Sequence, residues 1–174
     1  MVSQKHIVMY IATSMDGYIA REDGSIDWLE ETEGAGDNGY GDFFENIDTV
    51  IMGNKTYQQI HTLAEEFPYQ DKTCYVFSRS AKGKDEHVEF VNEDVGDFIE
   101  NLKGDSRIWL VGGAELVSEF MRKQLVDEMI LSIIPTVLGK GISLFQAGNP
   151  EVKLKLTNIQ QYGQIAQLHY QREK

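Results

Sequence analysis

The feature that most constrains the fold is an alternation of short, unbroken apolar runs with segments of helical periodicity. The runs are rich in β-branched and aromatic residues, and we expect five of them as strands: His6–Ala12, Thr49–Met52, Thr73–Phe77, Val88–Val91 and Ile108–Val111. They lack the polar alternation of a strand with one solvated face. The pattern therefore predicts a sheet that is covered by helices on both faces.

Four segments between and around these runs show the spacing of amphipathic helices. They are Tyr40–Asn46, the stretch from Asn54 to Leu63, Val95–Leu102 and Gly113–Gln124. Asn54 and Asn92 are good N-cap residues for two of them. In the helix that follows Gly53, we expect Thr56, Tyr57, Ile60 and Leu63 to face inward.

The C-terminal third changes character. Glu128–Val137 reads as a long strand interrupted by Pro135, and two further strands, Val152–Tyr162 and Gln164–Gln171, are joined at Gly163. The alternation of Val152, Leu154 and Leu156 with polar residues indicates a half-solvated strand. We therefore predict one α/β domain over residues 1–174. It is a three-layer α/β/α structure with a mixed, mainly parallel sheet and an antiparallel C-terminal pair.

Composition excludes several classes of function. The 174 residues carry 16 Lys and Arg against 28 Asp and Glu, a net charge of −12, which argues against a nucleic-acid or anionic-membrane partner. No apolar run approaches the roughly 20 residues of a membrane span. Cys74 is the one cysteine, and the four histidines are scattered, so neither a disulfide nor a metal site is expected. The expected location is the cytoplasm.

Three junctions that follow buried strands hold the residues most suited to chemistry. They are Val50–Thr56 (VIMGNKT), Val76–Ser80 (VFSRS) and Leu110–Ala114 (LVGGA). In open α/β sheets, ligands bind beyond the carboxyl ends of such strands, and a helix N-terminus there attracts anions. A Gly-Gly pair is also an ordinary tight turn, so both interpretations remain open. Neither the Rossmann nor the P-loop glycine spacing is present.

The order of these junctions resembles the dihydrofolate reductase superfamily. Ser14–Ala20 (SMDGYIA) and Leu138–Phe145 (LGKGISLF) are similar to signatures of the riboflavin-pathway reductases, and the closest resemblance is to their standalone reductase-domain proteins. It implies NADPH as cofactor and a homodimer paired through the C-terminal strands. The cofactor-binding residues that it implies are Ala12, Ile19, Gly53, Asn54, Lys55, Thr56, Phe77, Ser78, Arg79, Val111, Gly112, Gly113, Ala114 and Leu116.

Two residues are candidates for the substrate side of the site. Asp16 is suited to contact the substrate and to relay a proton as the catalytic residue, or alternatively to cap backbone N–H groups in an Asp-Gly turn. Trp28 either lines the substrate pocket or anchors the core.

We therefore expect an NADPH-dependent reductase that transfers a hydride to a small heterocyclic or carbonyl substrate. The main alternative is a non-catalytic nucleotide- or pterin-binding module on the same fold, which Glu115 favours because it places negative charge beside the Gly-Gly turn. A third possibility is a protein-interaction domain. Deaminase activity is excluded, because its zinc signature requires several cysteines and Cys74 stands alone.

Overall fold

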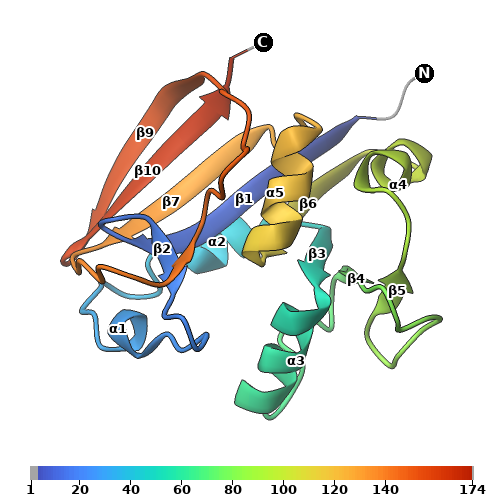
Figure 1. Cartoon of the computed structure of the whole chain (residues 1–174), viewed down its shortest axis with the longest axis horizontal. Coiled ribbons are helices and arrows are strands. Elements are labelled where there is room, and N and C mark those ends of the chain that lie inside the picture. Colours follow the sequence, from blue (N-terminus) through green and yellow to red (C-terminus); the bar gives the residue numbers. More distant parts are fainter. Residues whose placement is uncertain (1–3, 174) are drawn as a thin grey trace.

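One eight-stranded sheet forms the centre of the molecule in a computed structural model that describes residues 4–173 (Figure 1). The strand order is β5-β4-β3-β6-β1-β7-β10-β9. The strands are β1 (Lys5–Ser14), β3 (Thr49–Gly53), β4 (Thr73–Phe77), β5 (Glu89–Val91), β6 (Ser106–Gly112), β7 (Glu128–Ile134), β9 (Leu154–Tyr162) and β10 (Ile165–Arg172). The first six strands are parallel to one another. Strand β10 is antiparallel to both of its neighbours, β7 and β9. The predicted mixed sheet is confirmed.

Helices cover both faces of this sheet, as predicted. Helices α4 (Val95–Asn101) and α5 (Ala114–Arg122) pack on one face, against residues such as Ile7 and Met9 of β1. Helices α2 (Tyr40–Glu45) and α3 (Asn54–Leu63) share a second core with Val8 of the same strand. Successive residues of a strand point to opposite faces, so the unbroken apolar run of β1 supplies both cores.

Both predicted asparagine caps are wrong. Asn54 is already the first residue of α3, and Gly53 occupies the N-cap position. Asp94, and not Asn92, caps α4, because its carboxylate accepts a hydrogen bond from the Asp97 N–H at 3.2 Å. Leu63 is also not inward-facing: it is 72% exposed at the end of α3.

Strand β7 ends where its backbone can no longer pair, and not where its apolar run ends. Strand β7 stops at Ile134 because Pro135 has no N–H to donate to the ladder. A short helix, α1 (Asp27–Glu30), and a small two-stranded sheet of β2 (Tyr18–Ala20) and β8 (Ile142–Ser143) complete the fold. Next to that sheet, a Cβ on Gly141 would clash with the carbonyl oxygen of Ala20, so only glycine fits there.

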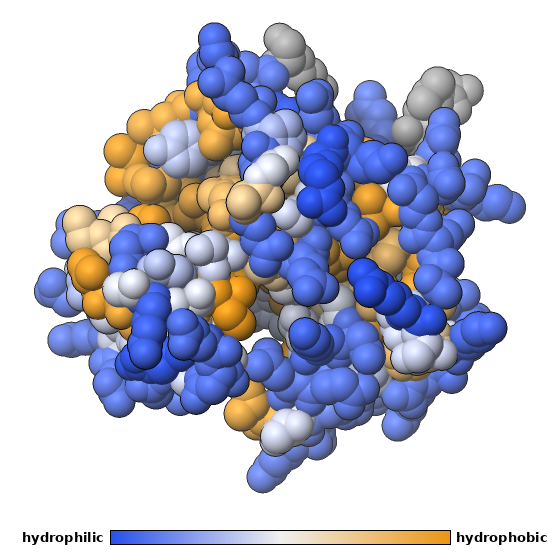
Figure 2. Space-filling model, viewed as in Figure 1, coloured by the Kyte–Doolittle hydropathy of each residue, from blue (hydrophilic) through white to orange (hydrophobic). Residues whose placement is uncertain are grey.

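One part of the sheet remains uncovered on the α5 side. Leu131, Leu168 and Ile159 lie in register across β7, β10 and β9, and Tyr170 is paired with Leu156 in the next row. We call these five residues the apolar sheet face. Ile159 is 60% exposed and Leu156 is 47% exposed. Figure 2 shows the corresponding apolar surface at the upper left, where Figure 1 places β9 and β10.

Candidate functional site

The sheet order brings the three junctions side by side. Strands β4, β3 and β6 are neighbours, with Gly53 in register with Phe77 and Met52 in register with Gly112. All three strands are parallel, so their carboxyl ends lie at one edge. Ala12 of β1, the next strand, is near the same edge.

The glycine turns after β3 and β6 touch each other. A Cβ built on Gly53 would lie 3.7 Å from both the Gly112 carbonyl oxygen and the Gly113 nitrogen. Gly113 in turn approaches the Thr56 hydroxyl, at 3.6 Å for a built Cβ. Gly112 is buried and has φ +138°, yet a Cβ there would meet no atom within 4 Å. The turns therefore leave open space beside their own backbone, as close approach of a ligand requires.

Two helix N-termini point hydrogen-bond donors at this space. Helices α3 and α5 begin directly after the glycine turns, and in the described structure neither start has a side-chain cap. Uncapped N–H groups and the helix dipole together favour an anion. The Asn54 side-chain oxygen is buried without a hydrogen-bond partner among the described residues, so an acceptor is also available there. Glu115, in the first turn of α5, opposes the positive potential.

Two basic residues flank the turns. Lys55 and Arg79 are both exposed, and within residues 4–173 neither is part of an ion pair. Arg79 follows Ser78, whose buried hydroxyl accepts hydrogen bonds from the N–H groups of Ser80 (3.3 Å) and Ala81 (3.0 Å). This turn fixes the backbone next to Arg79, while both cationic side chains stay available for a phosphate.

Asp16 holds two loops together. Its carboxylate accepts hydrogen bonds from the N–H groups of Leu138 (3.1 Å) and Gly139 (2.8 Å), and from the Ser14 hydroxyl at 2.6 Å. The Ser14 hydroxyl is the largest cause, and these bonds together lower the pKa of Asp16 below its ordinary value. The turn after β1 is thereby tied to the Leu138–Phe145 loop, and the carboxylate is ionised at neutral pH.

Trp28 lies in the core. It is only 3% exposed and packs with Ile134 and Ile165, with Ala12 at the edge of the same cluster. Its indole nitrogen is buried without a partner among the described residues. Of the other predicted residues, Ala114 and Leu116 are buried at the start of α5, and Val111, Ile19 and Phe77 pack partly against the cores.

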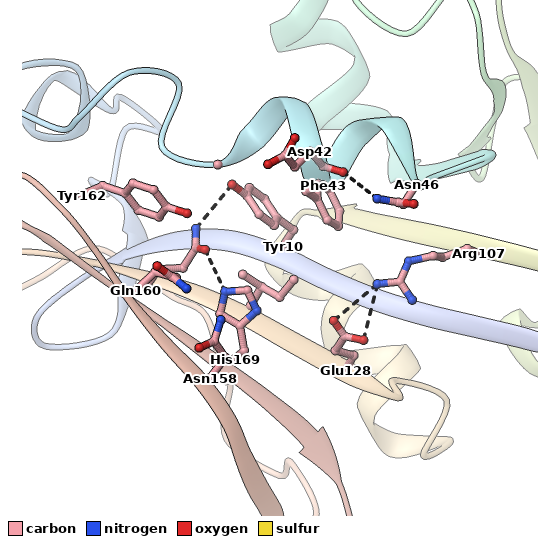
Figure 3. Close-up of a pocket in the computed structure, with 13 residues that line it drawn as sticks. Tyr10, Asp42, Phe43, Asn46, Arg107, Glu128, Asn158, Gln160, Tyr162 and His169 are labelled. Carbon is pink, nitrogen blue, oxygen red and sulfur yellow. Dashed lines mark hydrogen bonds and ion pairs between the residues drawn. The ribbon is translucent and has the colours of Figure 1, made fainter.

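A groove that the sequence reasoning missed lies on the α2 side of the sheet (Figure 3). It has a volume of about 490 Å³ and runs between α2 and the β9–β10 hairpin. Tyr10 and Phe43 stack in its wall with ring centroids 4.1 Å apart. Figure 3 also shows Arg107 paired with Glu128 at one end, at 3.4 Å.

A hydrogen-bond network forms the floor of this groove. Gln167 is 2% exposed, and its amide group donates to the hydroxyls of Tyr10 (3.4 Å) and Ser132 (3.2 Å). Its side-chain oxygen lies 2.9 Å from His169 Nε2, so this nitrogen carries the proton. Burial lowers the pKa of His169, which keeps the ring neutral at pH 7. The signal for an inward-facing Gln167 was its place two positions after Ile165 in a strand, which puts both side chains on the same face.

The described residues offer neither a metal site nor a membrane-spanning helix. No group of three or more His, Cys, Asp or Glu side chains within residues 4–173 is arranged to hold a metal ion. No helix of that part of the chain is long and apolar enough to cross a membrane.

The strand order and helix layers define a dihydrofolate reductase-like fold. A dihydrofolate reductase from Enterococcus faecalis superposes over 100% of both chains, with a TM-score of 0.68 at 15% identity. A Shewanella sp. PV-4 protein, whose name places it provisionally in riboflavin biosynthesis, gives a TM-score of 0.89 at 26% identity, over 97% of this chain and 99% of that one.

Residues 5–168 match the RibD C-terminal domain, and the chain belongs to that family. It is 54% identical to the uncharacterized protein YwjB of Bacillus subtilis (strain 168), over 97% of this chain and 99% of YwjB. The fold and the family that the sequence motifs predicted are thus confirmed.

Proposed function

We propose that this protein is an NADPH-dependent reductase that transfers a hydride to a small heterocyclic or carbonyl substrate, as in the riboflavin-pathway reductases. The observation that carries the proposal is the meeting of two glycine turns and two uncapped helix N-termini beside Lys55 and Arg79. A cytoplasmic location is part of the proposal, since Cys74 is a free, buried thiol.

The residues present fit a dinucleotide phosphate. The N–H groups at the start of α3, with Lys55 and Thr56, would bind phosphate oxygens, while Ser78 and Arg79 would bind the ribose carrying the extra phosphate. The open space beside Gly112 and Gly113 would admit the pyrophosphate of the cofactor. When bound, NADPH supplies the hydride. The protein's own task is to hold the reacting groups in contact and to exclude water.

The other residues predicted to contact the cofactor or the substrate lie in or beside the apolar cores. In this proposal Ala12, Ile19 and Phe77, with Val111, Ala114 and Leu116, form the apolar walls of the cofactor site, and Gly53 and Asn54 lie at its centre. Trp28 supports the substrate side through its packing against Ala12.

Asp16 could act either as a proton relay or as a positioning residue. As a proton relay it would have to give up a proton near neutral pH, but its lowered pKa keeps it ionised. Its hydrogen bonds to Leu138 and Gly139 favour the role of a positioning residue that holds the loop beside the site. A bound water then becomes the proposed proton donor.

The second candidate is a module that binds a nucleotide or pterin without catalysis. Two observations favour it: Glu115 places a carboxylate at the α5 N-terminus, and Asp16 is committed to structural hydrogen bonds. Stopped-flow mixing of NADPH-loaded protein with candidate carbonyl and imine substrates separates the candidates. The reductase oxidises NADPH in a single turnover that depends on the substrate, whereas the module binds NADPH and leaves it unchanged.

We also propose that the protein forms a homodimer through the apolar sheet face. Leu156 and Ile159 are the exposed large hydrophobic side chains of β9, an edge strand whose backbone is unpaired on its outer side in the described structure. A two-fold axis would bring the same patch of each subunit together, so this face could pair with its own copy. Pairing there would bury the exposed apolar area and leave the groove on the opposite face open.

A further inference from the structure

The groove between α2 and the β9–β10 hairpin is separate from the proposed reductase site. Tyr162 lines the groove and also belongs to the cluster of Trp28, Ile134 and Ile165. Ala12, which lies toward the cofactor edge, packs against the same cluster but does not line the groove. The groove therefore requires an explanation of its own.

Several polar groups that face the groove have no partner within the described part of the chain. The Asp42 carboxylate, the Asn158 and Gln160 amides and the Tyr162 hydroxyl make no side-chain hydrogen bond there. Figure 3 shows them around one space, with Asp42 on α2 opposite the three residues of β9. The Arg107 Nε–H is buried and unpartnered among the described residues. A concave surface in which a few polar groups converge beside aromatic side chains is a candidate binding site.

The floor beneath these groups is held rigid. Gln167 donates to Tyr10 and Ser132 and accepts from His169, and the Tyr10 ring is stacked on Phe43. None of these groups can turn toward a ligand without losing a buried hydrogen bond or a ring contact. A preorganised floor lowers the entropic cost of binding.

The mixture of groups selects the ligand chemistry. Arg107 and Glu128 neutralise each other at 3.4 Å, so Asp42 leaves the lining with an excess negative charge that disfavours anions. A cation would satisfy the carboxylate but would leave the Asn158 and Gln160 amide N–H groups without acceptors. Hydroxyl groups both donate and accept, so a neutral molecule rich in hydroxyls can pair with the carboxylate, the two amides and the Tyr162 hydroxyl.

We propose that this groove is a second binding site, for a neutral, polyhydroxylated small molecule of the size of a mono- or disaccharide. Its volume of about 490 Å³ lies within the range of small-molecule pockets. The site is independent of the reductase proposal, since none of its residues belongs to the three strand–helix junctions.

The test titrates glucose, sorbitol and sucrose into the full-length protein by calorimetry, with glucose 6-phosphate as the anionic counterpart of glucose. We expect saturable binding of at least one neutral compound and weaker binding of the phosphate. Trp109 reports whether the ligand binds in the groove, because its indole N–H donates to the carbonyl oxygen of Tyr10, a groove residue, at 3.1 Å. The sequence has two tryptophans, so two indole NMR signals are expected, assigned with Trp28→Phe, and that of Trp109 should shift.

A double variant, Asn158→Ala with Gln160→Ala, should weaken binding about tenfold, since it removes two hydrogen-bonding side chains. Both residues are exposed, so the fold should be unaffected. Gln161→Ala is the matched control: the same residue type on the same strand, pointing to the opposite face. NADPH affinity should be equal in all of these proteins. The proposal is overturned if no neutral compound saturates, if glucose 6-phosphate binds more tightly than glucose, or if the double variant binds like the wild type.

Discussion

The backbone of Gly53 packs directly against the peptide unit of Gly112, with 3.7 Å between a Cβ built on Gly53 and the Gly112 carbonyl oxygen. This contact joins the ends of two neighbouring strands, β3 and β6, and brings the starts of α3 and α5 to one place. Neither helix alone would define a dinucleotide site. Their juxtaposition is the structural basis of the reductase proposal.

Substitution at the two glycines of the β6 turn should have different effects on stability. Gly112 has φ +138°, which L-residues rarely adopt, so Gly112→Ala should lower the free energy of unfolding by about 1–3 kcal/mol. Gly113 has φ −86°, and its Cβ would make an ordinary contact with Thr56, so Gly113→Ala should cost less than about 1 kcal/mol. Urea denaturation of both variants measures the difference, and equal losses would contradict the assignment of strain to Gly112.

Asp16→Asn should loosen the loop that Asp16 anchors. The Asn side chain keeps one acceptor oxygen, but an NH₂ group replaces the other oxygen. Because an NH₂ group cannot accept a hydrogen bond, the variant cannot keep both bonds from the Leu138 and Gly139 N–H groups. We expect faster proteolytic cleavage within residues 136–145 and a lower melting temperature. If Asp16 relayed a proton, the variant would instead change the pH profile of single-turnover hydride transfer while cleavage of the loop stayed the same.

The same carboxylate predicts an acid limit for the loop. The folded-state pKa of Asp16 lies below its ordinary value near 3.8, so its contribution to stability is present above that pH. The contribution is lost as the pH falls through the lower folded-state pKa. Hydrogen exchange at Leu138 and Gly139 should therefore accelerate selectively in strong acid, and an exchange profile equal to that of Asp16→Asn at every pH would contradict this.

Gln167→Leu should be strongly destabilising, because Gln167 is a buried polar residue at the centre of a hydrogen-bond network. The change leaves the Tyr10 and Ser132 hydroxyls and the His169 ring without their shared partner in a buried setting, at a cost of about 1–3 kcal/mol. Gln161→Leu, on the other face of the hairpin, should change stability by less than about 0.5 kcal/mol. Chemical denaturation tests both, and similar effects would show that the network has no stabilising role.

Burial of His169 predicts a second pH effect. Its folded-state pKa is below the ordinary 6.5, so the unfolded chain binds this proton more readily. Stability should be full above about pH 6.5 and should fall as the pH drops from there through the folded-state pKa. In His169→Gln the loss of stability between pH 7.5 and 5.5 should be smaller. An unchanged loss would assign the effect to other groups.

Ile159→Glu should separate the proposed homodimer into monomers, because it places a charge on the apolar sheet face. Leu63→Glu is the control, since Leu63 is also an exposed large hydrophobic residue but lies at the end of α3. Sedimentation velocity gives the mass of each. A wild-type monomer, or a dimer that survives Ile159→Glu, would contradict pairing through this face.

The fold was predictable from local pattern because buried strands and glycine junctions are local signals. The run from His6 to Ala12 needs both faces covered, and β1 does supply two cores. Helix caps were less predictable, since Asn54 and Gly53 are both acceptable N-caps and only the tertiary position of the β3 end decides between them.

The groove was not predictable in the same way. Gln167 contacts Tyr10 across 157 positions of sequence and Ser132 across 35, and these contacts exist only once β10 has paired with β7. No short motif encodes such a network. The Asp16 contacts with Leu138 and Gly139 are also long-range, which explains why its turn-capping role and its catalytic role could not be separated from the sequence.

The most direct test of the central claim is calorimetric titration of NADPH and NADH into the wild type and a Lys55→Ala, Arg79→Ala double variant. A Lys103→Ala, Arg122→Ala double variant is the charge-matched control, because both of these exposed cations lie away from the three junctions. We predict micromolar NADPH binding, weaker NADH binding, and a loss of at least about tenfold in the first variant alone. No binding of either nucleotide at millimolar concentration, or equal binding by all three proteins, would contradict the assignment of this site to NADPH.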